Sequence, residues 1–223
     1  MDMKYYKFRE CTENNLDTLS RSCIYAASCQ SFNDPYEGVC WVDAMAVKYE
    51  QVKNQSLLVH NKQRLNNRGF YCVASSENTD YLACEGLLIW VHYADAHKGY
   101  CVQYNERLLE GLEKDSLERG YCKMEYTDDM PYLPEDNDIS FMNVIKTKSK
   151  CWESENETRL IYRGQGLKSI NTDAIDAIYL GCMISDSNKS RLVSIAQRLG
   201  VQCFQMELRN DRRELKVSPV FFE

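Results

Sequence analysis

The sequence predicts an α+β protein: a single compact domain with a mixed or mostly antiparallel sheet and flanking helices. Strand-like and helical segments mix along the 223 residues without strict β–α–β alternation. No Gly/Ser-rich or Pro-rich linker divides the chain, which contains only four prolines. A chain of this length can bury roughly 70–75% of its unfolded surface in one core. We therefore expect one domain over residues 1–223.

Alternating or apolar runs bounded by turn residues predict the strands. These runs cover residues 4–9, 23–27, 69–75, 99–104, 121–126, 158–163, 174–181, 201–207 and 213–217. Helical patterns cover residues 12–21, 43–67, 87–95, 105–115, 139–150 and 187–199. Thr12 and Ser187 are the expected N-caps of two helices, and Gly200 is expected to end the last one. Residues 31–38 and 127–138 are expected to be exposed loops.

Charge and cysteine usage limit the class of protein. The net charge of −6 argues against a general nucleic-acid binder, which usually has a basic face. We expect Lys146, Lys148 and Lys150 to lie on a solvated face. The 11 cysteines are odd in number and form no C-x-x-C pair, which predicts free, reduced thiols. No signal-like or membrane-spanning stretch is visible, so we expect a cytoplasmic protein without a membrane partner.

The turn Phe32-Asn-Asp-Pro-Tyr-Glu-Gly38 is the first candidate for chemistry. An Asn-Asp pair before proline favours an Asx-type turn, which would hold Asn33, Asp34 and Glu37 near one point. The alternative is structural, with Asp34 accepting hydrogen bonds from nearby backbone N–H groups.

The second candidate is the segment from Trp90 to Gly99, which contains two of the three histidines. His92 lies in an apolar, aromatic run beside Tyr93, where it could act as a base or a hydrogen-bond donor. The spacing from His92 to His97 is not that of a helical metal pair, and we expect His97 to be an ordinary surface residue.

The third candidate is a charged stripe late in the chain. If residues 155–161 form a strand, Glu155, Glu157 and Arg159 share a face with Ile161, and Leu160 lies on the other face. Neighbouring carboxylates raise one pKa, and an arginine can restore the ionised form or bind an anion. The alternative is an exposed strand edge kept soluble by its charges. We expect the three candidates to line one concave site.

These segments together resemble a bacterial family of unknown function. The resemblance is carried by four motifs and a later strand, which stand here as Tyr6-Lys-Phe-Arg9, Phe32-Asn-Asp-Pro-Tyr-Glu37, Trp90-Val-His-Tyr-Ala-Asp-Ala-His-Lys-Gly-Tyr-Cys101, Trp152-Glu-Ser-Glu-Asn-Glu-Thr-Arg-Leu160 and Ile178-Tyr-Leu-Gly181. They extend over most of the chain. The resemblance implies a shared fold and does not supply an activity.

A second resemblance is to ADP-ribosyltransferases, which have a compact split α+β fold. It rests on a basic first strand, a short helix after it and a late E-x-E, although the H-x-T and S-T-S patterns of that family are absent. The resemblance implies NAD as cofactor. Glu157, Glu155 and His92 would then be catalytic, and the cofactor-binding residues would be Lys7, Arg9, Asn33, Asp34, Tyr93 and Arg159.

The leading hypothesis is therefore an NAD-dependent transferase or NAD-cleaving enzyme, such as a toxin or antiphage effector. Glu157, aided by Glu155, would stabilise the oxocarbenium ion that forms as nicotinamide leaves. One alternative is a non-catalytic module that binds an anion or a partner. Another is a magnesium-dependent nuclease that uses Asp34, Glu37 and the E-x-E carboxylates. The expected partner is a small nucleotide, with nucleic acid only as a substrate.

Overall fold

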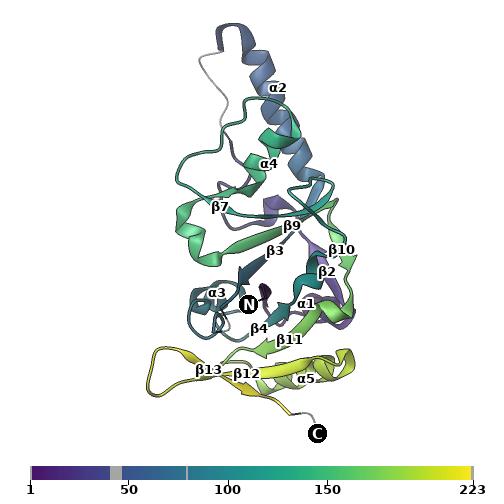
Figure 1. Ribbon diagram of the computed structural model, residues 1–223, viewed down its shortest axis with the longest axis vertical. Helices are drawn as coiled ribbons and strands as arrows, with labels where there is room; N and C mark the ends of the chain where they lie inside the picture. Colours follow the sequence, from purple (N-terminus) through teal and green to yellow (C-terminus); the bar gives the residue numbers. More distant parts are fainter. Residues whose placement is uncertain (1, 41–46, 79, 222–223) are drawn as a thin grey trace.

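Nine strands form one mixed, mostly antiparallel sheet in the computed structural model, which describes residues 2–40, 47–78 and 80–221 (Figure 1). In spatial order they are β13 (Leu215–Pro219), β12 (Gln202–Leu208), β11 (Ile175–Leu180), β4 (Tyr100–Tyr104), β1 (Lys4–Arg9), β3 (Arg68–Ser76), β9 (Glu157–Arg163), β6 (Arg119–Lys123) and β5 (Glu113–Lys114). Two small sheets pair β10 (Gly166–Ser169) with β2 (Cys23–Ala26), and β7 (Glu125–Tyr126) with β8 (Thr147–Lys148). This architecture confirms the predicted α+β class.

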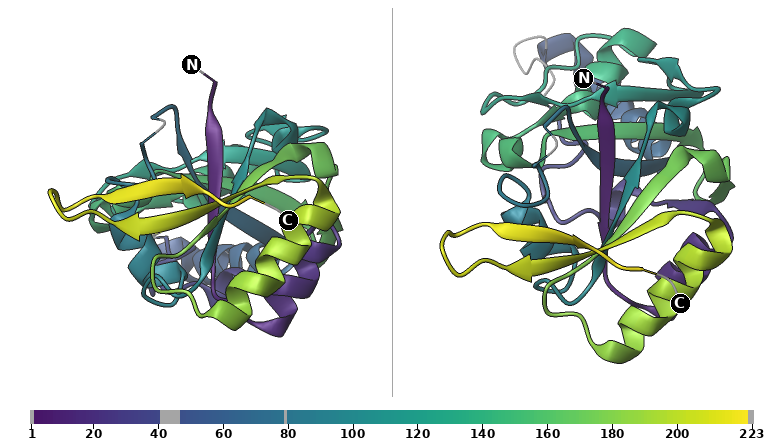
Figure 2. Two further views of the ribbon diagram at one scale, coloured as in Figure 1. Left: turned by 90° about the horizontal axis from the view of Figure 1, so that it is seen from below. Right: turned by 60° about the horizontal axis from the view of Figure 1, so that its bottom comes forward.

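The helices cover the sheet at separate places. α1 (Glu13–Ser20) and α5 (Asp186–Leu199) lie side by side against one face, where Leu16 and Leu192 enter the largest core (Figure 2). α3 (Leu87–Tyr93) packs on the other face through Trp90, which is fully buried beside Phe8. α2 (Val47–Asn66) and α4 (Asp138–Lys146) lie at one end of the molecule, and the β12–β13 hairpin lies at the other (Figure 1).

The sheet separates between its two central strands. β1 pairs with β4 over residues 5–9, but it pairs with β3 only over residues 4–6. Beyond that point Ala27, just after β2, takes the place of β1 and exchanges both backbone hydrogen bonds with Phe70, each at 2.8 Å. A gap therefore opens between β1 and β3, and it is lined by backbone edges that would otherwise be paired.

Most predicted elements are confirmed, and the exceptions have local causes. Residues 105–115 form a 3₁₀ turn, η2 (Glu106–Leu109), followed by β5, because Gly111 has a φ of +73° and ends any helix there. The predicted strand 121–126 is β6 and β7, and the predicted helix 139–150 ends at Lys146, where β8 begins. β10 was not predicted. The expected start of α2 at Asp43 lies outside the described residues.

The 11 cysteines are all free thiols, as expected from their number and spacing, and Cys101, Cys122 and Cys203 are buried. None of the described helices has the length and apolar character needed to cross a membrane.

The N-cap of α5 provides a test of the local structure. Ser185, not the predicted Ser187, caps this helix, and its side chain accepts a hydrogen bond from the N–H of Asn188. Ser185→Ala should lower the free energy of unfolding by about 1 kcal/mol because that N–H loses its partner. Ser187→Ala is the matched control, since Ser187 is exposed in the first turn and should cost less than about 0.5 kcal/mol. Urea unfolding followed by circular dichroism would measure both values, and equal losses would contradict the assignment.

Candidate functional site

A pocket of about 340 Å³ occupies the gap between β1 and β3. Its walls come from β1, β3, β9, α3, the loop at residues 31–37 and the 3₁₀ helix η3 (Lys150–Glu155). Eight of the nine predicted site residues line it, namely Lys7, Arg9, Asn33, His92, Tyr93, Glu155, Glu157 and Arg159. The expected convergence of the three candidate segments is therefore present in the structure, and the roles of these residues stay predictions.

Asp34, the ninth predicted residue, does not line the pocket. It is buried, and its carboxylate accepts the N–H of Tyr36 at 2.9 Å, which is the structural alternative considered for this turn. Asn33 and Glu37 from the same turn do face the pocket. Asp34 therefore stabilises the backbone of the turn, whereas Asn33 and Glu37 line the site.

Glu157 and Arg159 are the centre of a buried network of charges. Lys148 Nζ lies 2.8 Å from one oxygen of Glu157, and Arg159 Nε lies 2.9 Å from the other. Arg159 also donates to Glu37 at 2.5 Å and 3.2 Å, and Lys148 donates to Glu155 at 2.5 Å. Two cations and three carboxylates thus satisfy one another beneath the pocket.

The electrostatics of this network favour the ionised forms. Burial alone would raise the pKa of Glu157, but the charges of Arg159 and Lys148 outweigh it and hold that pKa well below its ordinary value. Burial would lower the pKa of Lys148, and Glu157 and Glu155 instead raise it. Each charge is stable at neutral pH only because its partners are present.

The exposed-edge alternative and the placement of Glu155 on the strand were both wrong. β9 is a central strand between β3 and β6, so Glu157 and Arg159 are buried and do not lie on an exposed edge. Glu155 is not on the strand: it ends η3, and Asn156 then turns the chain with a φ of +44°. Glu155 and Glu157 are only two residues apart, but Glu155 reaches the site from η3 and Glu157 reaches it from β9.

Lys148 is the residue that sequence reasoning missed. It was expected on a solvated face with Lys146 and Lys150, which do pair with exposed carboxylates, but Lys148 itself is buried. The apolar side chains of α4 pack this segment into the core, and β8 then turns Lys148 inward beside Glu155. The only sequence feature that links Lys148 to Glu155 and Glu157 is the short separation along the chain, and a short separation does not by itself predict a contact.

Tyr93 and His92 form the α3 side of the site. Tyr93 donates its hydroxyl to Glu155 at 2.5 Å and accepts a hydrogen bond from Asn33 at 3.1 Å. Burial, followed by the hydrogen bond to Glu155, raises the pKa of Tyr93. His92 is exposed at the rim of the pocket. His97 is not an ordinary surface residue, since its half-buried ring stacks on Trp90 outside the pocket.

Lys7 and Arg9 differ from the other cations of the pocket. Neither forms an ion pair with a carboxylate in the part of the chain that the structure describes. Lys7 Nζ donates to the carbonyl of Cys72 at 2.6 Å, across the gap, and lies 5.0 Å from the centre of the Tyr71 ring. The guanidinium of Arg9 lies 5.8 Å from the same ring. These two side chains carry positive charge that the described protein does not neutralise with a carboxylate.

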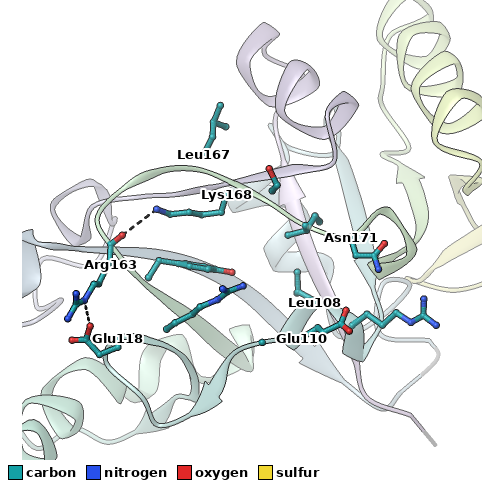
Figure 3. A pocket seen from close by; sticks show the side chains of 13 residues that line it. Leu108, Glu110, Glu118, Arg163, Leu167, Lys168 and Asn171 are labelled. Carbon is teal, nitrogen blue, oxygen red and sulfur yellow. Dashed lines mark hydrogen bonds and ion pairs between the residues drawn. The ribbon is translucent and has the colours of Figure 1, made fainter.

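A wider pocket of about 1030 Å³ lies between η2 and β10 (Figure 3). Arg163 is directed toward Glu118 there, and Lys168 donates to the carbonyl of Arg163 at 3.3 Å (Figure 3). The side chains of Arg163 and Glu118 are both more than half exposed, so solvent screens them strongly. None of the nine predicted site residues lines this pocket, and we place the candidate site in the smaller one.

Comparison with known proteins gives one match. A family model described as "Protein of unknown function (DUF2971)" matches residues 89–160, which is less than half of the chain. The matched segment contains His92, Tyr93, Glu155, Glu157 and Arg159, whereas Lys7 and Arg9 lie outside it. No curated protein and no solved structure matches the chain. The chain is therefore similar to this family over the segment that supplies the buried network apart from Glu37.

The burial of Glu157 gives a stability prediction. Glu157→Gln should lower the free energy of unfolding at pH 7 by about 3–5 kcal/mol, because Lys148 and Arg159 each lose a buried partner. Glu153→Gln is the matched control, since Glu153 is exposed and should cost less than about 0.5 kcal/mol. Urea unfolding measures both losses.

The same variants give a prediction for how the free energy of unfolding changes at acidic pH. The lowered pKa of Glu157 in the folded state contributes stability above the ordinary glutamate pKa, and this stability is lost as pH falls toward the folded-state value. The difference between wild type and Glu157→Gln should therefore narrow below about pH 4.5. A loss below 1 kcal/mol at pH 7, or a difference that does not change with pH, would refute the assignment of Glu157 to this network.

Proposed function

We propose that the pocket between β1 and β3 binds a small anionic ligand that carries a phosphate group and a planar ring. One observation carries the proposal: Lys7 and Arg9 line the pocket without an ion-pair partner among the described carboxylates. An arginine and a lysine placed this way commonly bind phosphate, with the guanidinium donating two parallel hydrogen bonds. The pocket volume of about 340 Å³ falls at the lower end of small-molecule sites.

The walls of the pocket support a ligand with a ring. Tyr25, Phe32, Phe70, Tyr71 and Tyr93 all line it. Aromatic walls with a few charged groups are typical of sites for nucleotides and similar cofactors. The gap in the sheet also exposes a backbone hydrogen-bond donor to a ligand. Strand alternation directs the N–H of Cys72 toward β1, and β1 does not pair with β3 at this residue. A nucleotide supplies the phosphate, the ring and the hydrogen-bonding edge that these features fit.

The finer proposal is that the nucleotide is NAD and that the pocket cleaves it. Glu157 lies on β9 and the cations Lys7 and Arg9 lie on β1, and β3 separates these two strands in the sheet, which allows the scissile bond and the pyrophosphate of a bound NAD to be contacted separately. Glu157 is held by two cations, Lys148 and Arg159, whereas Glu155 is held by one cation, Lys148, and by the neutral hydroxyl of Tyr93. We therefore assign stabilisation of the oxocarbenium ion to Glu155, with Glu157 as its support.

The nuclease alternative has no comparable observation in its favour. Over the described residues, no group of three or more His, Cys, Asp or Glu side chains could hold a metal ion. Glu37, Glu155 and Glu157 are each engaged by Arg159 or Lys148.

Isothermal titration calorimetry with inorganic phosphate, AMP and NAD tests the binding proposal. Arg9→Gln should weaken binding roughly 10- to 100-fold, the effect of losing a charged hydrogen-bond donor. Arg119→Gln is the matched control, because Arg119 lines the wider pocket and likewise has no ion pair among the described residues. The expected result is binding in which Arg9→Gln alone has an effect. Wild-type protein that binds none of the three ligands, or a loss confined to Arg119→Gln, would reject this site.

Release of nicotinamide from NAD tests the finer proposal. Glu155→Gln should slow release on the order of 100-fold, because it removes a preorganised charge, while NAD affinity changes much less. Protein, DNA and RNA are each offered as acceptor, and the melting temperature of the variant controls for its fold. NAD binding without release under any of these conditions would reject cleavage and leave the anion-binding function standing.

A further inference from the structure

Two lysines line the pocket, and their surroundings differ. Lys148 lies between Glu155 and Glu157, which keep it protonated. Lys7 Nζ instead contacts the carbonyl of Cys72 and the face of Tyr71, and no carboxylate pairs with it among the described residues. A neutral amine can keep the hydrogen bond to Cys72 with one of its N–H groups and leave its lone pair free.

The charge state of Lys7 is consistent with this geometry. Burial, followed by the neighbouring charge of Arg9, lowers the pKa of Lys7 to about 8, against smaller opposing effects of Cys72, Glu157 and Glu155. Roughly a tenth of this side chain is then neutral at pH 7, far more than for a surface lysine with an ordinary pKa. Desolvation and an adjacent cation are the two ways in which proteins activate a lysine as a nucleophile.

We infer that Lys7 forms a Schiff base with the carbonyl group of a phosphorylated aldehyde or ketone bound in this pocket. The inference rests on the proposed anion-binding function, and it adds a covalent step and a class of ligand. Arg9 holds the phosphate group two residues along the same strand face, so that the carbonyl carbon of the ligand lies toward Lys7.

The step balances without a further reagent. Lys7 loses one proton to water, and the amine lone pair attacks the carbonyl carbon to form a carbon–nitrogen bond. The carbonyl oxygen receives one proton from the nitrogen and one from water, its bond to carbon breaks, and it leaves as water. The net change converts an ammonium group and a carbonyl group into a protonated imine and water.

The surroundings of Lys7 suit the product as well as the reactant. The imine keeps the positive charge of the lysine, so the long-range attraction of Glu155 and Glu157 is retained. The ring of Tyr71 on β3 lies beside the amine and limits the access of water that would reverse the reaction.

Pyridoxal 5′-phosphate is the probe, because it combines an aldehyde, a phosphate group and a ring. Wild-type protein is treated with limiting probe at pH 7.5 and reduced with sodium borohydride, and the modified lysines are mapped by mass spectrometry. Lys7 should be labelled at least tenfold faster than the exposed Lys98. Arg9→Gln, excess AMP and replacement of the probe by pyridoxal should each slow labelling of Lys7, because each weakens phosphate binding.

The outcomes separate this inference from the proposed function. Labelling spread evenly over surface lysines, with phosphate still bound in calorimetry, would reject the Schiff base and keep the anion site. Absence of both labelling and phosphate binding would reject both. Lys7→Arg should abolish the labelled peptide while phosphate still binds, since the positive charge is kept. Undiminished total labelling of Lys7→Arg would place the reactive amine elsewhere.

Discussion

The buried contact between Glu157 and Arg159 is the interaction on which the candidate site depends. An unpaired guanidinium at the centre of a sheet would cost several kcal/mol, so Arg159 requires its carboxylates. Its donors hold Glu37 from the early turn and Glu157 from its own strand, and Glu157 in turn holds Lys148. One pair of side chains on β9 therefore ties together segments that are far apart in the sequence.

The gap between β1 and β3 and the buried charges beneath it together determine the character of the pocket. Once β1 leaves β3, the gap needs polar partners for exposed backbone, and Lys7 supplies one by donating to Cys72. Each carboxylate beneath the gap is already held by Arg159 or Lys148, and none of the described carboxylates forms an ion pair with Lys7 or Arg9. The result is a pocket whose floor consists of paired charges and whose β1 wall is positive.

The sequence predicted the elements and the convergence better than it predicted burial. Alternation identified β1 and β9 and separated the face of Glu157 from that of Leu160, which lies in the core. Periodicity does not say whether a strand is central or at an edge, so the depth of Glu157 was misjudged. The burial of Lys148 depends on how α4 packs, and the position of Glu155 depends on a left-handed turn at Asn156. The packing of α4 is a tertiary effect that a short window of sequence does not contain, whereas the turn at Asn156 is local and interrupts the alternation by which Glu155 was placed.

The cations of β1 and the charged pair of β9 have different roles in the site. The segment similar to the family of unknown function supplies Glu157 and Arg159, whereas Lys7 and Arg9 come from the first strand, outside it. A carboxylate that is already paired with two cations can stabilise a new positive charge on a ligand only weakly. Glu157 is therefore better suited to hold Lys148 and Arg159 in place than to act on the ligand itself. The amine of Lys7 and the guanidinium of Arg9 form no ion pair with the described carboxylates, so their positive charge is available to a ligand. Phosphate binding and amine chemistry in this pocket are therefore expected to centre on β1, above a floor that Glu157 and Arg159 hold in place.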